Sequence, residues 1–370
     1  MSAPGGPRER VVLACDFHRH YSAMLCGAFD RAGVGATLLT RDHDLEFGGV
    51  PGASRAFIDE AAGPGVELRT IDGRVRSRRG WRQALALRRE LRRDPPDYIH
   101  LQDAISNDVR LLVPTGTPRG RFALTVHDPV KHPGDVPQIF LRDLSERRLI
   151  SRAGVIFVHA EALREELEEI NRPKGAVVVI PHGVDPAPAV PLPERPSVVF
   201  FGRISYYKGL DVLLDAMQRV WKEVPEATLT IAGKGEIEPH AVFEDRRVEV
   251  RAGHLPEEAV PDLIQSASCV ALPYRQASQS GVGSRVKAYG RPLLVTDLGG
   301  LPELVADGSG LLVPSEDPDA MAAALVRVLS EPGLAQRLGD AAAETAAREG
   351  SWDTVAELTL AAYREHLGGR

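Results

Sequence analysis

The chain has 370 residues, of which 43% are hydrophobic and 26% charged, and its formal net charge at pH 7 is -6. This composition is typical of a soluble globular protein, and the negative charge argues against a general electrostatic attraction to nucleic acid. A chain of this length exceeds one ordinary hydrophobic core, so we expect two domains.

The N-terminal sequence MSAPGGPRER lacks the apolar stretch of a signal peptide, and no apolar run approaches the length of a membrane span. We therefore expect a cytoplasmic protein. Its three cysteines, Cys15, Cys26 and Cys269, lie in apolar runs and show no C-x-x-C spacing. They predict small buried side chains in a reducing compartment, with neither a disulfide framework nor a zinc site.

The first half of the chain alternates short apolar, β-branched runs with segments of helical spacing. Strands are expected at Val11–Cys15, Ala36–Thr40, Tyr98–Leu101, Phe122–Val126, Val155–Val158 and Val177–Ile180. Because these runs are apolar throughout, they are typical of parallel strands that helices cover on both faces. We therefore interpret residues 1–185 as a doubly wound α/β domain.

A proline-rich stretch, DPAPAVPLPERP at Asp185–Pro196, interrupts the alternation, since five prolines in twelve residues suit neither a helix nor a central strand. The alternation then restarts. Strands are expected at Val198–Phe201, Thr228–Ala232, Val248–Arg251, Val270–Leu272, Leu293–Thr296 and Leu311–Val313. A second α/β domain is therefore predicted over residues 186–350, and residues 351–370 carry a helical pattern with no strand after it.

Ligands of open α/β sheets bind beyond the C-terminal ends of the strands, so the loops after the predicted strands are the candidates for a site. In FGRISYYKGL, Phe201–Leu210, the cations Arg203 and Lys208 lie between a strand and a helix. A planar guanidinium and a flexible ammonium beside a helix N-terminus suit a phosphate or diphosphate. A solvated pair of cations on a loop is the alternative interpretation.

Further loops after predicted strands carry weaker signals. The loop Leu272–Pro292 is rich in small residues, which let backbone N–H groups approach an anion, although an ordinary flexible loop has the same composition. His127 directly follows a strand, where it can bind a polar substrate, move a proton or serve the structure alone. Glycine-rich turns occur at Ile231–Glu236 and Arg251–Pro256.

Together these segments resemble family 4 of the retaining glycosyltransferases. The resemblance rests on VVFFGRISYYKGLDVLLDAM, TLTIAGKGE, ALPY, AYGRPLLVTDLGGLPELVADGSGLLVP and SWDTVAELTLAAYREHL, and in the first half on DYIHLQDA, LTVHD and VVVIPHGVD. It covers most of the chain from about Asp97 onward and is most specific from Val198 to Pro314. It implies the GT-B fold, in which two tandem Rossmann-like, doubly wound domains face a cleft, with residues 351–370 crossing back to the first domain.

The resemblance also implies a retaining, hexosyltransferase-like enzyme of carbohydrate biosynthesis. Its second domain would bind a nucleoside-diphosphate-sugar donor, and its first domain a glycan, lipid or small molecule with an acceptor hydroxyl. The implied donor-site residues are Arg203, Lys208, Gly253, His254, Leu255, Ser280, Gly281 and Val282.

Each of these residues has an implied role. Arg203 and Lys208 would hold the diphosphate and, with His127 at the transferred sugar, form the catalytic set. Backbone amides at 280–282 would cradle the diphosphate, and residues 253–255 would lie near the base. Because the two cations take the place of a metal, neither a metal nor another cofactor is expected.

One departure from the family pattern affects the donor site. The family usually has an acid that contacts the sugar and, after seven more residues, a glutamate that holds the ribose hydroxyls. These positions are Ala277 and Arg285 here. A charged hydrogen bond contributes roughly 1.5–3 kcal/mol, so the change can alter donor choice or activity.

A second departure affects the acceptor side. The family often has a glycine pair after the first strand, where this chain has DFHRHYS. The bulky polar residues of this loop are His18, Arg19, His20 and Tyr21. We predict that they line an acceptor pocket, for instance for an acidic acceptor, with an ordinary polar loop as the alternative.

Two other motifs point away from the main interpretation. Asp42-His43-Asp44 imitates the D-x-D motif of metal-dependent transferases of another fold, but the two-domain layout argues against a metal there. Between Arg69 and Arg93 the chain carries ten arginines. This pattern fits either a solvated helix face or a peripheral contact with an anionic membrane or an acidic partner.

Two functional alternatives stay open at the level of sequence. A GT-B-fold sugar epimerase or phosphorylase would need acid–base carboxylates in the cleft, and the sequence offers no clear candidates. A non-catalytic nucleotide- or sugar-binding relative that lost the acidic pair would have no need for Arg203, Lys208 and His127 together.

Overall fold

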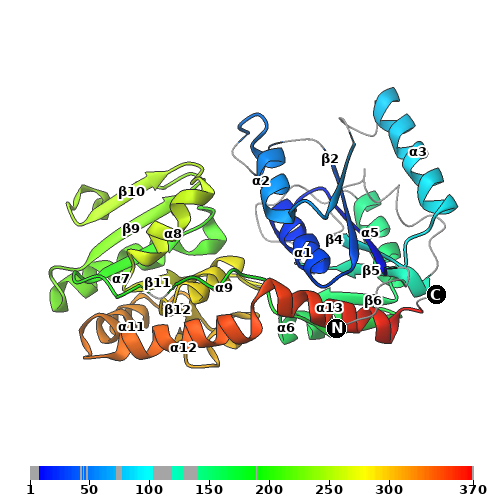
Figure 1. Cartoon of the computed structure of the whole chain (residues 1–370). Coiled ribbons are helices and arrows are strands. Elements are labelled where there is room, and N and C mark those ends of the chain that lie inside the picture. The colour runs from blue at the N-terminus through cyan, green and yellow to red at the C-terminus, as the bar shows by residue number, and fades with distance from the viewer. Residues whose placement is uncertain are drawn as a thin grey trace.

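Two parallel sheets organise the chain (Figure 1), and the computed structural model describes residues 8–41, 44, 46, 49–71, 77–102, 119–128, 140–188 and 190–368. The first sheet has seven strands in the order β3-β2-β1-β4-β5-β6-β7, and the second has six in the order β10-β9-β8-β11-β12-β13. In each sheet the strand order reverses beside the first strand of that half, where doubly wound sheets place their ligand crevice.

The first sheet is built early in the chain. Its strands are β1 (Arg10–Cys15), β2 (Gly35–Arg41), β3 (Glu67–Ile71), β4 (Tyr98–Gln102), β5 (Phe122–Thr125), β6 (Val155–Val158) and β7 (Ala176–Val179). The helices in this half are α1 (Arg19–Arg31), α2 (Ala53–Ala62), α3 (Arg78–Arg93), α5 (Phe140–Arg152) and α6 (Glu161–Asn171).

The second sheet follows the proline-rich stretch. Its strands are β8 (Ser197–Phe201), β9 (Thr228–Gly233), β10 (Val248–Ala252), β11 (Cys269–Leu272), β12 (Leu293–Thr296) and β13 (Gly310–Val313). The helices are α7 (Leu210–Glu223), α8 (Val260–Gln265), α9 (Gly281–Ala288), α10 (Leu301–Val305), α11 (Pro318–Ser330), α12 (Leu334–Glu349) and α13 (Trp352–His366). No helix within the described ranges is long and apolar enough to cross a lipid bilayer.

Every strand that the sequence predicts is present, with ends that differ by at most one residue. Strand β3 is not predicted by its sequence, ELRTI. It lies at the edge of the first sheet, and among its residues only Ile71 is fully buried. An edge strand with so little buried surface lacks the apolar run that marks the central strands.

Helices cover both faces of each sheet, which explains the uninterrupted apolar runs. Along β1, Val11, Leu13 and Cys15 belong to one buried cluster, whereas Val12 and Ala14 belong to another on the opposite face. Successive side chains of a strand alternate between faces, so a strand buried on both sides is apolar at every position.

The cysteines are buried and unpaired, as predicted. Burial raises the pKa of the Cys15 and Cys269 thiols to about 12, since a thiolate would lose its hydration inside the core. These side chains therefore act as small hydrophobic residues at neutral pH.

Helix α13 belongs in space to the first sheet although it follows the second sheet in the chain. Ser351 caps its N-terminus by accepting a hydrogen bond from the Thr354 N–H, and the helix then packs against α1 and β6 (Figure 1, red). Trp352 and Tyr363 lie in the same buried cluster as the residues of β1 and α1. The core of the first sheet is therefore completed by a helix from the far end of the described chain.

Candidate active site

The loop between β8 and α7 carries the two predicted cations. Gly209, the residue before α7, has a φ of 64°, and a Cβ there would lie 1.9 Å from the Pro273 carbonyl oxygen, so the tight turn requires glycine. The Lys208 ammonium lies over the Tyr274 ring, 3.6 Å from its centroid, and Arg203 lies 6.0 Å from the Tyr207 ring. Aromatic faces attract cations, so both charges are held near the ends of β8 and β11.

The N-terminus of α9 faces the same place. Ser280 caps this helix by accepting a hydrogen bond from the Gly283 N–H at 3.2 Å, and its hydroxyl lies 3.3 Å from the Tyr274 hydroxyl. A Cβ at Gly202, directly after β8, would lie 3.5 Å from Val282. Tyr274 and Gly202 thus bring the cation loop and the start of α9 together, where the helix dipole favours an anion.

A cavity of about 590 Å³ opens beside Arg203 in the second domain. The residues around it come mainly from the C-terminal ends of β8 and β9 and from the loops after β8, β9 and β10. The described residues that line it are Phe201, Gly202, Arg203, Ile204, Gly233, Lys234, Gly235, Gly253, His254, Leu255, Glu257 and Val260. This size suits a nucleoside-sized ligand, and the predicted base-site residues 253–255 are among the lining residues.

The first domain contributes a cluster of aromatic and imidazole rings. His18 stacks on His127 with ring centroids 4.0 Å apart, His127 lies 4.9 Å from His159, and His159 lies 5.1 Å from His182. The Tyr21 ring contacts three of these imidazoles and Trp352. The four imidazoles come from the loops that follow β1, β5, β6 and β7, so the cluster lies at the C-terminal edge of the first sheet.

Burial keeps His127, His159 and His182 of this cluster neutral. The pKa of His127 is well below its usual range because the ring is buried and has other histidines as neighbours, and the same causes lower the pKa of His159 to about 4. Nε2 of His127 donates to Oε1 of Gln102 at 3.1 Å, which leaves its Nδ1 as an acceptor. His127 can therefore bind a hydroxyl but carries no charge at pH 7.

The residues predicted for the acceptor side take different orientations. Arg19 and Tyr21 are 1% and 4% exposed, and the Arg19 guanidinium donates to the Ser54 hydroxyl and to the Arg41 carbonyl oxygen. His18 reaches the ring cluster instead, with φ of 60°. The structure therefore turns Arg19 into the interior of the first domain, whereas the buried Tyr21 and the less buried His18 both contact His127.

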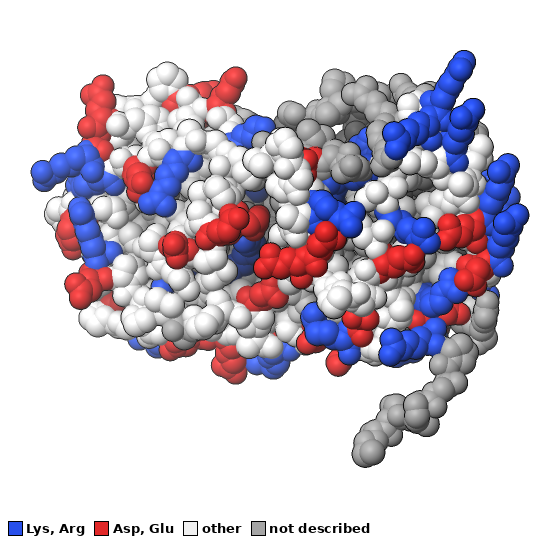
Figure 2. Space-filling view, turned by 45° about the horizontal axis from the view of Figure 1, so that its top comes forward, with Lys and Arg blue, Asp and Glu red and all other residues white. Residues whose placement is uncertain are grey.

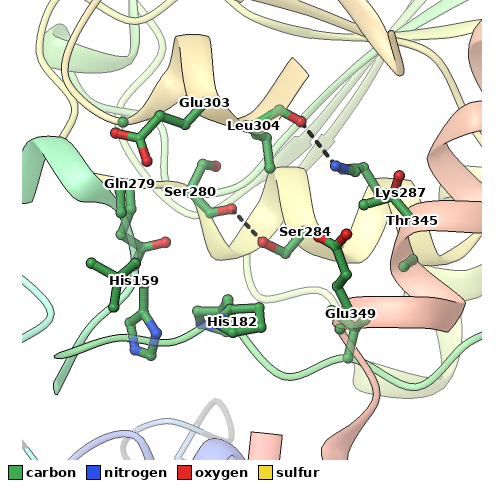
Figure 3. A pocket seen from close by; sticks show the side chains of 17 residues that line it. His159, His182, Gln279, Ser280, Ser284, Lys287, Glu303, Leu304, Thr345 and Glu349 are labelled. Carbon is green, nitrogen blue, oxygen red and sulfur yellow. Dashed lines mark hydrogen bonds between the residues drawn. The ribbon is translucent and has the colours of Figure 1, made fainter. Parts of the chain in front are cut away.

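The two domains meet around a cavity of about 310 Å³ that is lined in part by α9 (Figure 3). The Glu303 carboxylate of the second domain accepts hydrogen bonds from the N–H groups of Glu161 and Ala162 at 2.7 and 2.8 Å, at the N-terminus of α6. The backbone of Gly281 lies so close to His182 that a Cβ added at this glycine would be 3.1 Å from Nε2 of the imidazole. Two contacts therefore join the first-domain rings and α6 to the start of α9 and to α10.

Arg285, at one of the two departures from the family pattern, forms an ion pair with Glu257 at 2.9 Å. The other position, Ala277, packs beside the buried cluster that contains Tyr274. Burial lowers the pKa of His20 in the first domain. The ring also lies close enough to the ion pair for Glu257 to raise this pKa and for Arg285 to lower it, both by smaller amounts. The ion pair therefore lies at the opening between the domains.

Sequence reasoning missed several residues that contact this region: Gln102, His159, His182, Glu257 and Glu303. Gln102 and His159 each follow a predicted strand directly, and His182 lies in the quoted segment VVVIPHGVD. Position after a strand was therefore a usable signal for three of the five. Glu257 and Glu303 carry no such local signal.

The metal-like motif and the arginine-rich segment are each described only in part. Asp42 and His43 lie outside the described residues, whereas the Asp44 carboxylate accepts from the N–H groups of Gly52 and Ser54 at the start of α2. Within the described ranges, no group of three or more His, Cys, Asp or Glu side chains could hold a metal ion.

The arginines of α3 lie at one end of the molecule, where Figure 2 shows basic side chains gathered over this helix. Residues 72–76 of the arginine-rich segment lie outside the described ranges. Arg69 is paired with Glu67 and Glu90. Contact of this surface with an anionic membrane stays a prediction.

Comparisons with known proteins cover both halves of the chain. The model of "Glycosyltransferase Family 4" matches residues 20–188, and that of "Glycosyl transferases group 1" matches residues 195–331. A D-inositol 3-phosphate glycosyltransferase of Kribbella flavida is 31% identical over 318 residues, which cover 75% of this chain and 74% of that protein. A glycogen synthase of Mycobacterium tuberculosis is 30% identical over 230 residues, or 59% of this chain, and the match spans only 56% of that relative.

Solved structures share the fold at low sequence identity. Sucrose-phosphate synthase of Thermosynechococcus elongatus superposes with a TM-score of 0.75 and 19% identity, covering 97% of this chain and 99% of that one. HepE of Anabaena, in complex with UDP and glucose, gives a TM-score of 0.72 and 14% identity over 97% of this chain and 100% of that one. The predicted GT-B fold is thereby confirmed.

Proposed function

This chain belongs to family 4 of the glycosyltransferases, and we propose that it moves a sugar from a nucleoside-diphosphate-sugar donor to a hydroxyl group of an acceptor. The observation that carries the proposal is the convergence of Arg203, Lys208 and the N-terminus of α9 beside a cavity of about 590 Å³. Two cations and a helix N-terminus form a site for a diphosphate, and the cavity beside it has room for the nucleoside.

In this proposal the transfer retains the anomeric configuration and uses no metal. The acceptor oxygen bonds to the anomeric carbon while the bond from that carbon to the diphosphate oxygen breaks, and the acceptor proton passes to that diphosphate oxygen. Arg203, Lys208 and the α9 amides would stabilise the negative charge that develops on the leaving group. Attack and departure on one face leave the configuration unchanged.

His127 would position the transferred sugar in this reaction. Its neutral ring lies between His18 and His159, with Nδ1 available as a hydrogen-bond acceptor. A neutral acceptor suits a sugar hydroxyl, and the glycan, lipid or small-molecule acceptor would enter over the same edge of the first sheet. The catalytic set is therefore His127, Arg203 and Lys208.

The alternative of an epimerase or phosphorylase with acid–base carboxylates gains no support from the described cleft residues. Glu257 is paired with Arg285, and Glu303 is bound to the backbone of α6. A non-catalytic binding protein would bind the nucleotide sugar without transferring the sugar, so a measurement of turnover distinguishes it from the proposed enzyme.

Thermal unfolding with UDP, GDP, ADP, TDP and CDP tests the donor site. A ligand at a hundred times its dissociation constant stabilises the folded state by about 2.7 kcal/mol, a shift of several degrees in unfolding temperature. We expect one nucleotide to stabilise the protein and the response to vanish in R203A/K208A. Silence of the whole panel would contradict the proposal. Release of free nucleotide from the matching sugar nucleotide, with an acceptor present, then separates an enzyme from a binding protein.

A further inference from the structure

Glu257 is the only acidic side chain among the described residues that line the 590 Å³ cavity. The other lining residues are four glycines, apolar residues, His254 and the cations Arg203 and Lys234. A nucleoside that enters this cavity brings a ribose with two neighbouring hydroxyl groups, and these need hydrogen-bond acceptors when water is displaced. A carboxylate, with two oxygens, is suited to accept from both hydroxyls.

The Glu257 carboxylate is held in place by a side chain from another element. Its Oε2 lies 2.9 Å from Nη2 of Arg285, which projects from α9, whereas Glu257 begins the short turn before α8. The two side chains are 38% and 28% exposed, so neither is fully solvated. An ion pair through one oxygen leaves lone pairs for other donors while it restricts the rotamers of the carboxylate.

The position of this pair fits a ribose better than a base or a phosphate. The cation Arg203 marks the diphosphate end of the cavity, and residues 253–255 form the neighbouring wall just before Glu257. The pair also lies at the opening toward His20 of the first domain.

We propose that Glu257, oriented by Arg285, is the ribose-binding residue of the donor site and makes the site selective for ribonucleotides. The carboxylate that relatives supply from the helix after β11, at the position of Arg285, comes here from the loop after β10. This inference rests on the proposed function and assigns one contact within it. Arg285 is a positioning residue in this arrangement.

Titration calorimetry with UDP and its 2′,3′-dideoxy analogue tests the assignment; if another nucleotide of the panel stabilises the protein, that nucleotide and its dideoxy analogue are used instead. We expect the unsubstituted protein to bind the ribonucleotide about 10- to 100-fold more tightly, the value of a charged hydrogen bond. E257Q should lower ribonucleotide affinity to that of the analogue and leave analogue binding within twofold.

The chain offers a matched control next to the tested residue. Glu258 is exposed and does not line the cavity, so E258Q makes the same change of charge and should keep the full ribose preference. The swapped variant E257R/R285E keeps the ion pair and moves the carboxylate to α9, and it should regain a preference for the ribonucleotide. Unchanged unfolding temperatures would show that all three variants are folded.

Two results would overturn the inference in different ways. A ribose preference that survives in E257Q would remove Glu257 from the site while leaving the donor site and the proposed function intact. Failure of the unsubstituted protein to bind any nucleotide of the panel would instead overturn the proposed function, and this inference with it.

Discussion

The two domains present helix N-termini to the cleft in opposite ways. In the first domain, carboxylates occupy them: Glu46 accepts from the backbone N–H groups of His18 and Arg19 at the start of α1, and Glu303 does the same for α6. In the second domain, α9 begins at Gly281 and is capped by the neutral hydroxyl of Ser280.

Because of this difference, only the helix N-terminus of the second domain, among these three, is suited to bind an anion. A helix N-terminus already bound to a carboxylate has little left to offer an anion, whereas one capped by a hydroxyl keeps its favourable field. The first domain surrounds its edge of the cleft with neutral imidazoles instead. In the function proposed above, the anionic part of the donor would therefore bind to the second domain and the hydroxyl groups of the sugar and acceptor to the first.

Removing the cations of the second domain should have the largest effect. Each charged hydrogen bond contributes roughly 1.5–3 kcal/mol, so R203A/K208A should weaken binding of the nucleotide identified in the panel by about 10²- to 10⁴-fold in titration calorimetry. The control K222A/R327A removes two exposed cations of the same domain at sites on α7 and α11. Equal losses in both variants would mean that net charge, and not this loop, attracts the nucleotide.

The two domains should also differ in their stability to acid: as the pH falls, the first domain should unfold before the second. His100 and His127 are 0% and 1% exposed, and burial lowers the pKa of His100 to about 3 and that of His127 well below its usual range. In the unfolded chain both titrate near pH 6.5, so below that pH the unfolded state binds more protons and the free energy of unfolding falls. From pH 7 to pH 5 the pair should cost about 4 kcal/mol.

Hydrogen exchange at pH 7 and pH 5 measures this expectation for each sheet separately. Peptides from β1, β4 and β5 should lose protection at pH 5, while those from β8 and β11 keep it, because the second-domain histidines His240 and His254 are not buried in a core. The free energy of unfolding should fall less steeply with decreasing pH in H127Q, by about 1.4 kcal/mol per pH unit. Simultaneous loss of protection in both sheets would contradict the uneven placement of buried histidines.

His127→Ala should divide turnover from nucleotide binding. A side chain that positions the transferred sugar contributes to the reaction but not to the diphosphate site, so we expect transfer to fall about 100-fold while the dissociation constant of the nucleotide changes less than twofold. H240A, which alters a second-domain histidine near Asp215, is the control. Weakened nucleotide binding in H127A would place the ring in the donor site instead.

Glu303→Gln should have the smallest effect. The neutral amide keeps one acceptor oxygen for the N–H groups of α6 but loses the favourable interaction of a charge with the helix dipole, which contributes about 0.3–1 kcal/mol. A decrease of about 1–2 °C in unfolding temperature is expected. E349Q changes another carboxylate of the same cavity and should leave the temperature unchanged.

The sequence predicts those features whose chemistry is local. Arg203 and Lys208 share one loop, and small residues after a strand mark the start of α9, so the donor side could be found before the structure. Contacts between distant segments could not. Glu257 meets Arg285 through the folding of the second domain, and Glu303 meets α6 across the two domains. Neither glutamate lies in a motif that reveals its partner.

The same distinction explains what was missed in the fold. Central strands have an apolar signature because burial on both faces requires it, and all of them are predicted. Strand β3 is an exposed edge, so its residues carry no such requirement. The orientation of Arg19 toward Ser54 is likewise set by α2, a neighbour that its own loop does not specify.

The return of α13 to the first domain has a consequence for how the protein is made. The ribosome releases β1 to β7 long before Trp352 and Tyr363, which the buried cluster around β1 needs for completion. During synthesis the earlier domain must therefore wait, with apolar surface uncovered, until the later domain has emerged. The order of synthesis and the order of final assembly differ, and a chaperone that shields α1 and β6 in that interval would act on the first half alone.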